Sequence, residues 1–209
     1  NDVDLFIIVW QDVSNFGEKY NPILNFDFTK YPNTICKLYT PNKERGGTWN
    51  ETQKRNIGLE IAKEENCTHF LHLDCDEYYE DFNAAKKEFI HSGAKGSVCQ
   101  MYTYFKKPTL RLENEDNYYV PFIHELNEKT NAGNYDYPYY VDPTRKINES
   151  NVILLDVYMH HFSWIRKDIE RKVRNSSAKH NIERSQLLID YNSKETKAGT
   201  FLVDYNQKL

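Results

Sequence analysis

Strands and a helix alternate in the first third of the sequence, and this alternation constrains the fold more than any other feature. Residues 3–10 (VDLFIIVW) form a short continuous apolar run, typical of a strand buried on both faces. Residues 34–39 predict a second strand, residues 50–64 show the apolar spacing of a helix, and residues 67–73 return to an apolar strand. We therefore expect a βαβ unit in a mostly parallel sheet, with residues 3–10 as its first, central strand.

The later sequence predicts further elements with a less regular stretch between them. Residues 81–91 are typical of a helix and residues 97–105 of a strand. Residues 106–150 hold four of the seven prolines and only short strand-like pieces. Residues 152–158 predict a last clear strand, and residues 165–191 carry a helical period with strong charge. A length of 209 residues suits one α/β domain better than two.

Composition excludes several classes of protein. The formal net charge of -4 is spread over mixed signs without a basic block, so we expect no nucleic-acid partner. No apolar run approaches the roughly 18 residues that a membrane span needs, which predicts a soluble protein. The cysteines lack CxxC spacing, which favours reduced thiols in a cytoplasm-like compartment: Cys36, Cys67, Cys75 and Cys99. A start at Asn1 instead of methionine fits a piece of a longer protein.

An apolar run ends abruptly in acids within residues 68–81 (THFLHLDCDEYYED). Asp74 and Asp76 stand two residues apart, and at that spacing side chains of an extended chain project to the same side. Two carboxylates held together repel each other unless a cation joins them, and oxygen ligands favour Mg²⁺ or Mn²⁺. The alternative is a solvated loop whose acids precede a helix.

The sequence resembles a GT-A glycosyltransferase of the family-2-like, DxD-containing kind. The resemblance rests on four stretches between Leu5 and about Arg174: FIIVWQD, ETQKRNIGLEIAKEENC, HFLHLDCDEYY and YMHHFSWIR. It implies an α/β, Rossmann-like mixed, mainly parallel sheet flanked by helices. The sequence also resembles small glycosyltransferase domains of large algal viruses, which implies the host cytoplasm as the location.

The resemblance implies one GT-A domain over residues 1–209 with three parts. Residues 1–105 would be the nucleotide-sugar-binding half, residues 106–164 the acceptor side, and residues 165–209 a C-terminal helical segment.

Roles for individual residues also follow from the resemblance. Asp76 would bind the metal directly, and Asp74 would contact the ribose or the metal. Gln11 and Asp12 follow the first strand, where the family holds uracil and ribose, and Arg55 lies where a cation approaches the diphosphate. The implied cofactor is Mn²⁺ or Mg²⁺, with a UDP-sugar as donor.

A third metal ligand in this family comes from a late histidine, here His160 or His161. Neighbouring side chains of a strand point to opposite faces, so we expect only one of them at the site and prefer His161, with the other in packing. Arg166 would neutralise the leaving diphosphate. Its alternative role is in the solvated first turn of a helix.

Sugar transfer by inversion needs one carboxylate to take the proton of the acceptor hydroxyl. The candidates are Glu125, Asp142 and Asp156, with Glu125 first because it lies in the irregular middle region. A retaining enzyme would lack such a base, and the sequence leaves the two outcomes open.

The expected function is therefore transfer of a hexose or deoxyhexose from a nucleotide-diphospho-sugar, foremost a UDP-sugar, to a saccharide or glycan acceptor. A sugar nucleotidyltransferase is the enzyme alternative, although the loop QDVSNFGEKY has one glycine where that class has several. A carbohydrate-binding domain without catalysis is the third interpretation. The sequence leaves the oligomeric state open.

Overall fold

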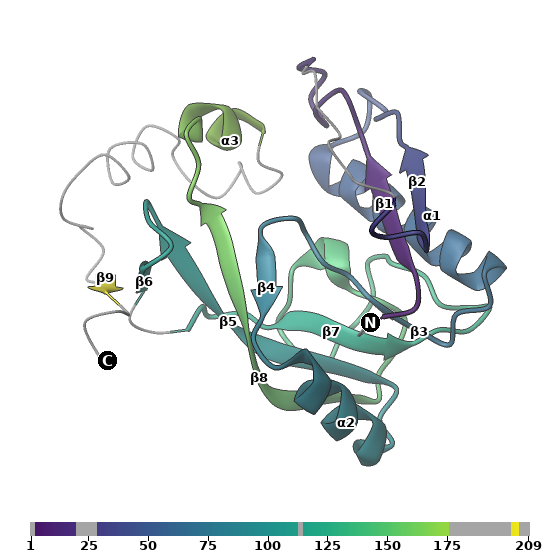
Figure 1. Ribbon diagram of the computed structural model, residues 1–209. Helices are drawn as coiled ribbons and strands as arrows, with labels where there is room; N and C mark the ends of the chain where they lie inside the picture. Colours follow the sequence, from purple (N-terminus) through teal and green to yellow (C-terminus); the bar gives the residue numbers. More distant parts are fainter. Residues whose placement is uncertain (1–2, 20–28, 113–114, 176–201, 205–209) are drawn as a thin grey trace.

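Two separate sheets carry the fold in the computed structural model (Figure 1), which describes residues 3–19, 29–112, 115–175 and 202–204. The smaller sheet consists of β1 (Phe6–Trp10) and β2 (Thr34–Leu38), paired in parallel. The larger sheet is mixed and curved, and its strands are β3 (His69–Leu71), β4 (Glu77–Tyr79), β5 (Gly96–Phe105), β6 (Leu110–Leu112), β7 (Val120–Glu125), β8 (Val152–Trp164) and β9 (Leu202–Asp204). The chain is therefore of mixed α/β class, as the sequence predicts.

The expectation of a mainly parallel sheet with a central first strand is wrong. Of the seven strand pairings described, β1 with β2 and β5 with β8 are parallel, and the other five are antiparallel. β7 comes from the irregular middle of the sequence and lies antiparallel between β3 and β5. β1 pairs with β2 alone among the described strands, and its side chains are only partly buried.

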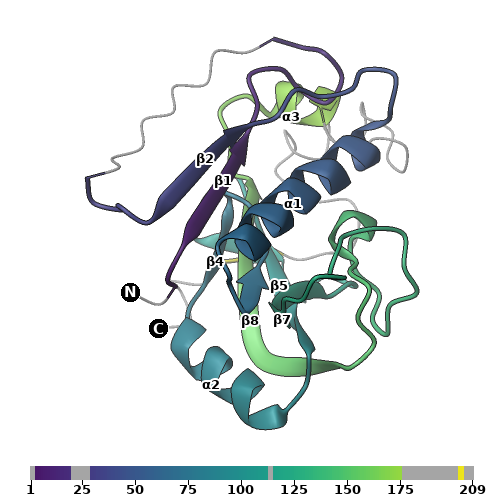
Figure 2. The same ribbon diagram turned by 90° about the vertical axis from the view of Figure 1, so that its right-hand side faces the viewer.

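Helix α1 (Gly47–Glu64) packs against β1 and begins three residues before the expected range (Figure 2). Gly46 occupies the position before the helix, and Asn50 is buried within its first turns. The Asn50 side chain accepts hydrogen bonds from the Tyr39 hydroxyl at 2.6 Å and from the Asn42 backbone N–H at 2.8 Å. These bonds tie the loop after β2 to the helix.

Helix α2 (Phe82–Ser92) confirms the predicted helix within one residue at each end. The Asp81 carboxylate accepts from the Ala84 backbone N–H at 3.1 Å, which caps the start of the helix. Gly93 ends it with φ of 68°, a left-handed conformation that glycine adopts without strain. Helix α3 (Ile169–Asn175) lies within the predicted late helix but begins four residues later than expected, and residues 176–191 lie outside the described residues.

The main core lies between the larger sheet and α2. Phe122 of β7 is fully buried at its centre, with its ring centroid 4.5 Å from that of Tyr79. Phe89 of α2 and Met101 and Met159 of β5 and β8 complete this layer. The core therefore holds β4, β5, β7 and β8 together, and these strands carry the candidate site described below.

Replacing Gly96 by alanine is expected to lower the free energy of unfolding by about 1–3 kcal/mol, because the new methyl group overpacks a closed space. A Cβ there would lie 2.6 Å from Cδ2 of His124 and 3.1 Å from Cγ2 of Val152. His124 cannot turn away freely, because its Nε2 lies 2.8 Å from the Tyr137 hydroxyl and its ring stacks on Phe70. Urea denaturation measures the effect.

Gly58→Ala is the matched control. Gly58 lies inside α1, and a Cβ there meets only Cγ2 of Val9, at 3.9 Å. This substitution is expected to stabilise the protein by about 0.5–1 kcal/mol, because alanine loses less backbone entropy in a helix. Equal effects of the two substitutions would contradict the packing described around Gly96.

Candidate functional site

Asp74 and Asp76 lie in the connection from β3 to β4, and Glu77 is the first residue of β4; residues 74–77 are called the acidic loop below. The loop is a turn: the Glu77 backbone N–H donates to the Asp74 carbonyl at 3.1 Å, and the Asp74 N–H donates to Oε2 of Glu77 at 2.9 Å. The expectation that Asp74 and Asp76 project to one side of an extended chain is therefore wrong. Each carboxylate contacts different arginines.

Asp74 lies between two arginines that the fold brings from distant parts of the chain. Its Oδ2 accepts from Nη2 of Arg145 at 2.7 Å, and Nη2 of Arg55 lies 3.5 Å from both carboxylate oxygens. Burial alone would raise the pKa of Asp74, but the two guanidinium groups outweigh it and hold that pKa below its ordinary value. Asp74 is therefore a carboxylate at neutral pH.

Arg145 is the residue of the site that the sequence interpretation missed. It ends a short 3₁₀ helix, η1 (Pro143–Arg145), whose first turn is capped by Asp142 through the Thr144 N–H at 2.7 Å. Its side chain is 6% exposed and also donates to Glu77, whose side chain is 2% exposed. Burial opposes the charge of Arg145, but Asp74 and Glu77 raise its pKa above the ordinary value.

Asn56, which follows Arg55 in α1, positions the loop that leads to η1. Its side-chain oxygen accepts from the Ala132 N–H at 2.7 Å, and its amide nitrogen donates to the Ala132 carbonyl at 3.0 Å. α1 also contacts η1 directly. The Arg-Asn pair of the helix therefore works as a unit, in which Arg55 reaches the acidic loop and Asn56 fastens the segment before Arg145.

Asp76 binds the third arginine of the site. Its Oδ2 accepts from Nη2 of Arg166 at 2.5 Å, and Nε of Arg166 donates to the Ser163 carbonyl at 3.1 Å. The Asp76 carbonyl accepts from the Phe162 N–H at 2.8 Å, which fastens the acidic loop to β8. Arg166 is thus held at the acidic loop instead of lying free in the first turn of a helix.

The two late histidines lie within β8 and face opposite sides of the sheet. His161 pairs with Glu77 and His160 with Tyr78, so only His161 is on the side of Glu77. Burial lowers the pKa of His161 to about 4, against the opposing effect of Asp76, so its imidazole is neutral at pH 7. His160 is buried on the other side, with Nδ1 2.8 Å from the Tyr104 hydroxyl.

The atoms of the site that could bind a metal ion are of the kinds that a hard divalent cation accepts. Asp74 and Asp76 offer carboxylate oxygens, and neutral His161 offers a ring nitrogen. In the arrangement described here the arginines occupy the carboxylates. Within residues 3–19, 29–112, 115–175 and 202–204, no group of three histidine, cysteine or acidic side chains is close enough to hold a metal ion. A cation at Asp76 therefore has to displace Arg166.

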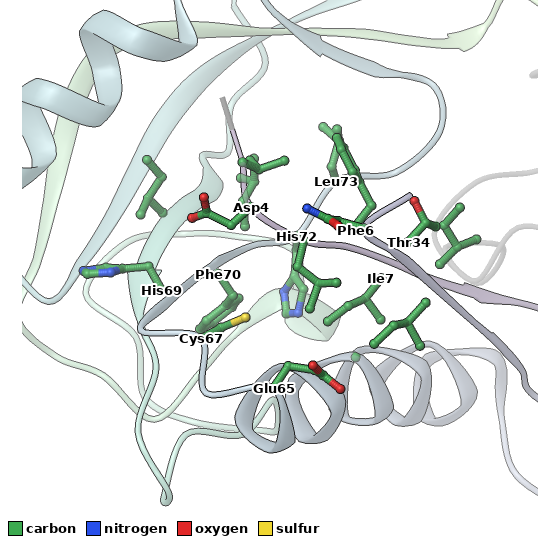
Figure 3. A pocket seen from close by; sticks show the side chains of 18 of the residues that line it. Asp4, Phe6, Ile7, Thr34, Glu65, Cys67, His69, Phe70, His72 and Leu73 are labelled. Atoms are coloured by element: carbon green, nitrogen blue, oxygen red, sulfur yellow. The ribbon is translucent and has the colours of Figure 1, made fainter. Parts of the chain in front are cut away.

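A large cleft of about 1040 Å³ separates β1 from β3 and ends at the acidic loop. Figure 3 shows Phe70 and His72 of the β3 segment on one side of this space and Ile7 of β1 on the other. Lys54 and Arg55 of α1 and Asp74 of the acidic loop also line it. The cleft combines apolar walls with a charged end, and its size is at the upper limit of small-molecule sites, about 1,000 Å³.

Four sequence-predicted site residues are not brought to the acidic loop. Gln11 donates to the Val13 carbonyl at 2.7 Å within its own loop, and Asp12 beside it is exposed, beyond the end of β1. Glu125 pairs with His69 at the start of β3, whereas the acidic loop follows the end of that strand. Asp156 is an exposed residue of β8, five positions before His161. The other sequence-predicted site residues do lie at or beside the acidic loop: Arg55, Asp74, Asp76, His161 and Arg166.

Comparison of the chain with protein-family models, with curated proteins and with solved structures finds no match. All four cysteines are free thiols. None of the helices within the described parts of the chain has the length and apolar character needed to cross a membrane.

Proposed function

We propose that the chain is a metal-dependent glycosyltransferase of GT-A type, which binds a nucleotide-diphospho-sugar, foremost a UDP-sugar, in the cleft between β1 and β3. One observation carries the proposal: a cleft of ligand size is lined by Lys54, Arg55 and Asp74, and Asp74 belongs to an acidic loop that also contacts Arg145 and Arg166. Diphosphate binding needs cationic groups, and metal binding needs the acids. A site of this composition can supply both.

Each residue of the site has a role in this proposal. Arg55 and Lys54 line the cleft and would bind the phosphate oxygens, with the nucleoside between the apolar walls. Asp76, Asp74 and His161 would hold Mn²⁺ or Mg²⁺. That ion would neutralise charge on the leaving diphosphate. Arg166, released from Asp76, would then approach the phosphates from the β8 side.

For the acceptor side of the reaction, the proposed residues come from the sequence predictions alone. A saccharide hydroxyl must lose its proton as it attacks the anomeric carbon. Glu125 and Asp156 stay the predicted bases, although the described residues place neither at the acidic loop. Water can replace the acceptor, so donor hydrolysis reports the donor half of the reaction without an acceptor.

Incubation with Mn²⁺ and a panel of UDP-, GDP- and dTDP-sugars tests the proposal, with release of the nucleoside diphosphate as the measured product. We expect slow hydrolysis of at least one donor, abolished by EDTA. Release of pyrophosphate from a nucleoside triphosphate and a sugar 1-phosphate would favour the nucleotidyltransferase instead. Sugar binding that ignores EDTA, with no turnover of any donor, would favour a carbohydrate-binding domain.

Arg166→Gln is expected to tighten Mn²⁺ binding by about 10-fold, because the competing guanidinium group is removed from Asp76 and charge competition at such a pair is worth on the order of 1 kcal/mol. Electron paramagnetic resonance of free Mn²⁺ measures this affinity directly, without turnover.

Lys167→Gln is the matched control, since it removes the same charge from the exposed neighbouring residue. Its Mn²⁺ affinity is expected to equal that of the wild type. If both substitutions change Mn²⁺ binding alike, the ion does not compete with Arg166 for Asp76.

A further inference from the structure

A row of side chains crosses three neighbouring strands of the larger sheet on the face of the acidic loop. Glu77 of β4 pairs with His161 of β8, and His161 pairs with Thr103 of β5. Neighbouring strands lie about 4.8 Å apart, so Thr103 is one strand spacing from His161. The row therefore leads from the acidic loop, through a proposed metal ligand, to the hydroxyl group of Thr103.

Asp116 extends this row beyond β5. Its Oδ2 accepts a hydrogen bond from the Thr103 hydroxyl, and its backbone N–H donates to the Met101 carbonyl at 2.9 Å. Among the described residues, its other oxygen, Oδ1, accepts no hydrogen bond. The residue is partly exposed to solvent, as a group that receives an external substrate has to be.

The side chain of Tyr118 connects Asp116 to the acidic loop. It lines a small cavity of about 60 Å³ together with Asp74 and His161. Burial raises the pKa of Tyr118, and the negative charge of Asp116 raises it further, whereas Arg145 opposes both. Asp116 and the acidic loop therefore both lie within electrostatic range of this one side chain.

The other carboxylates at or beside the acidic loop are already engaged. Asp74 and Asp76 pair with arginines, and Glu77 is buried in a pair with a third carboxylate-binding contact of Arg145. Asp142 caps η1, because its Oδ1 accepts from both the backbone N–H and the hydroxyl of the residue two positions later, at 2.7 and 2.8 Å. None of these groups is free to take a proton from a substrate without breaking an existing contact.

Asp116 differs from them in its electrostatic surroundings. Within the part of the chain that the structure describes, it forms no ion pair. Burial raises its pKa, and the hydrogen bond from Thr103 opposes this shift. A carboxylate whose pKa is raised toward neutrality is a stronger base, which suits it for general base catalysis.

We propose that Asp116 is the catalytic base that takes the proton of the acceptor hydroxyl group, and that the transfer inverts the anomeric carbon. The proposal rests on the proposed function and adds the residue that activates the acceptor. The acceptor oxygen forms a bond to the anomeric carbon, and the bond from that carbon to the diphosphate oxygen breaks. Its electron pair leaves with the nucleoside diphosphate, and the proton passes to Asp116.

Azide distinguishes a base from a residue that only supports the fold, because azide attacks without losing a proton. Its nitrogen forms the bond to the anomeric carbon, the diphosphate leaves, and a glycosyl azide results. Asp116→Asn is expected to slow Mn²⁺-dependent donor hydrolysis by at least about 100-fold, the loss typical when a general base is removed. Formation of the glycosyl azide should change only a few-fold. Release of the nucleoside diphosphate and mass spectrometry of the sugar product measure the two reactions.

Glu115→Gln is the matched control, since it removes the same charge from the neighbouring residue on the other face of the sheet. Glu115 accepts from the Tyr102 hydroxyl at 3.0 Å, and Tyr102 pairs with His160, which faces away from the acidic loop. This variant should keep both reactions. Asp76→Asn should slow both, because Asp76 is proposed to act on the leaving diphosphate.

The outcomes separate this proposal from the proposed function. Equal losses of hydrolysis and azide transfer in Asp116→Asn, or hydrolysis within a few-fold of the wild type, would overturn the role of Asp116. A glycosyl azide with the anomeric configuration of the donor would overturn inversion, whereas the opposite configuration is expected. If the wild type hydrolyses no donor, the proposed function is refuted, and the proposal with it.

Discussion

Asp76→Asn is expected to lower the rate of UDP-sugar turnover by at least about 100-fold, the loss typical when one preorganised electrostatic group is removed from an active site. Asparagine has nearly the same shape, so the substitution removes the charge and leaves the turn of the acidic loop intact. The carbonyl bond from Asp76 to the Phe162 N–H involves only backbone atoms and remains. Hydrolysis of the best donor with saturating Mn²⁺ measures the effect.

The stability of this variant should change little. Asp76 loses its pair with Arg166, but the Arg166 side chain is 42% exposed, and exposed ion pairs contribute at most about 1 kcal/mol. Asp136→Asn repeats the chemical change on an exposed loop and should keep full turnover. Turnover in Asp76→Asn within a few-fold of the wild type would remove Asp76 from the mechanism.

Arg145→Gln is expected to lower the free energy of unfolding by about 3–5 kcal/mol, because breaking a buried ion pair leaves the partner charge buried without compensation. Glu77 is that partner, with a side chain that is 2% exposed. Burial raises the pKa of Glu77, and Arg145 is the main group that opposes this shift. Urea denaturation at pH 7 measures the loss of stability. The folded form of this variant should bind Mn²⁺, and the unfolded form should not.

A double-mutant cycle separates the pair from the rest of the site. Glu77→Gln removes the uncompensated charge, so adding it to Arg145→Gln should cost less than the sum of the two single losses. Arg174→Gln removes an exposed guanidinium group from α3 and should cost less than about 1 kcal/mol. Additive losses in the cycle would show that Arg145 stabilises the fold through other contacts.

Local sequence signals predicted single elements well. Asp81 and Gly93 bracket α2 because a side-chain cap and a left-handed residue act within one turn of the helix. The alternation of side chains along a strand correctly separated His160 from His161, since that rule needs no knowledge of the neighbouring strands.

Such local signals could not predict which strands, distant in the sequence, pair with one another. β7 contains Pro121 and lies in an irregular stretch of sequence, yet it is the strand that pairs with β3. Nothing in the sequence of residues 143–145 shows that Arg145 meets Asp74, 71 positions earlier. The turn of the acidic loop was also missed, because the spacing of Asp74 and Asp76 was interpreted for an extended chain.

The candidate site was therefore predicted in part. The sequence predicted five residues near a metal and a diphosphate, and the structure places all five at or beside the acidic loop: Arg55, Asp74, Asp76, His161 and Arg166. Of these, Arg55 and Asp74 line the cleft. Their roles stay predictions. Each of the two carboxylates is paired with an arginine, so their negative charges are balanced within the acidic loop.

Isothermal titration calorimetry of UDP binding, with Mn²⁺ and then with EDTA, tests the central claim most directly. The account predicts that UDP binds at least about 10-fold more tightly with Mn²⁺, a gain of about 1.4 kcal/mol, since the ion joins the diphosphate to Asp76 and Asp74. Asp76→Asn should remove this gain and keep the weaker binding to the arginines. UDP affinity that is the same with and without Mn²⁺ would contradict the account.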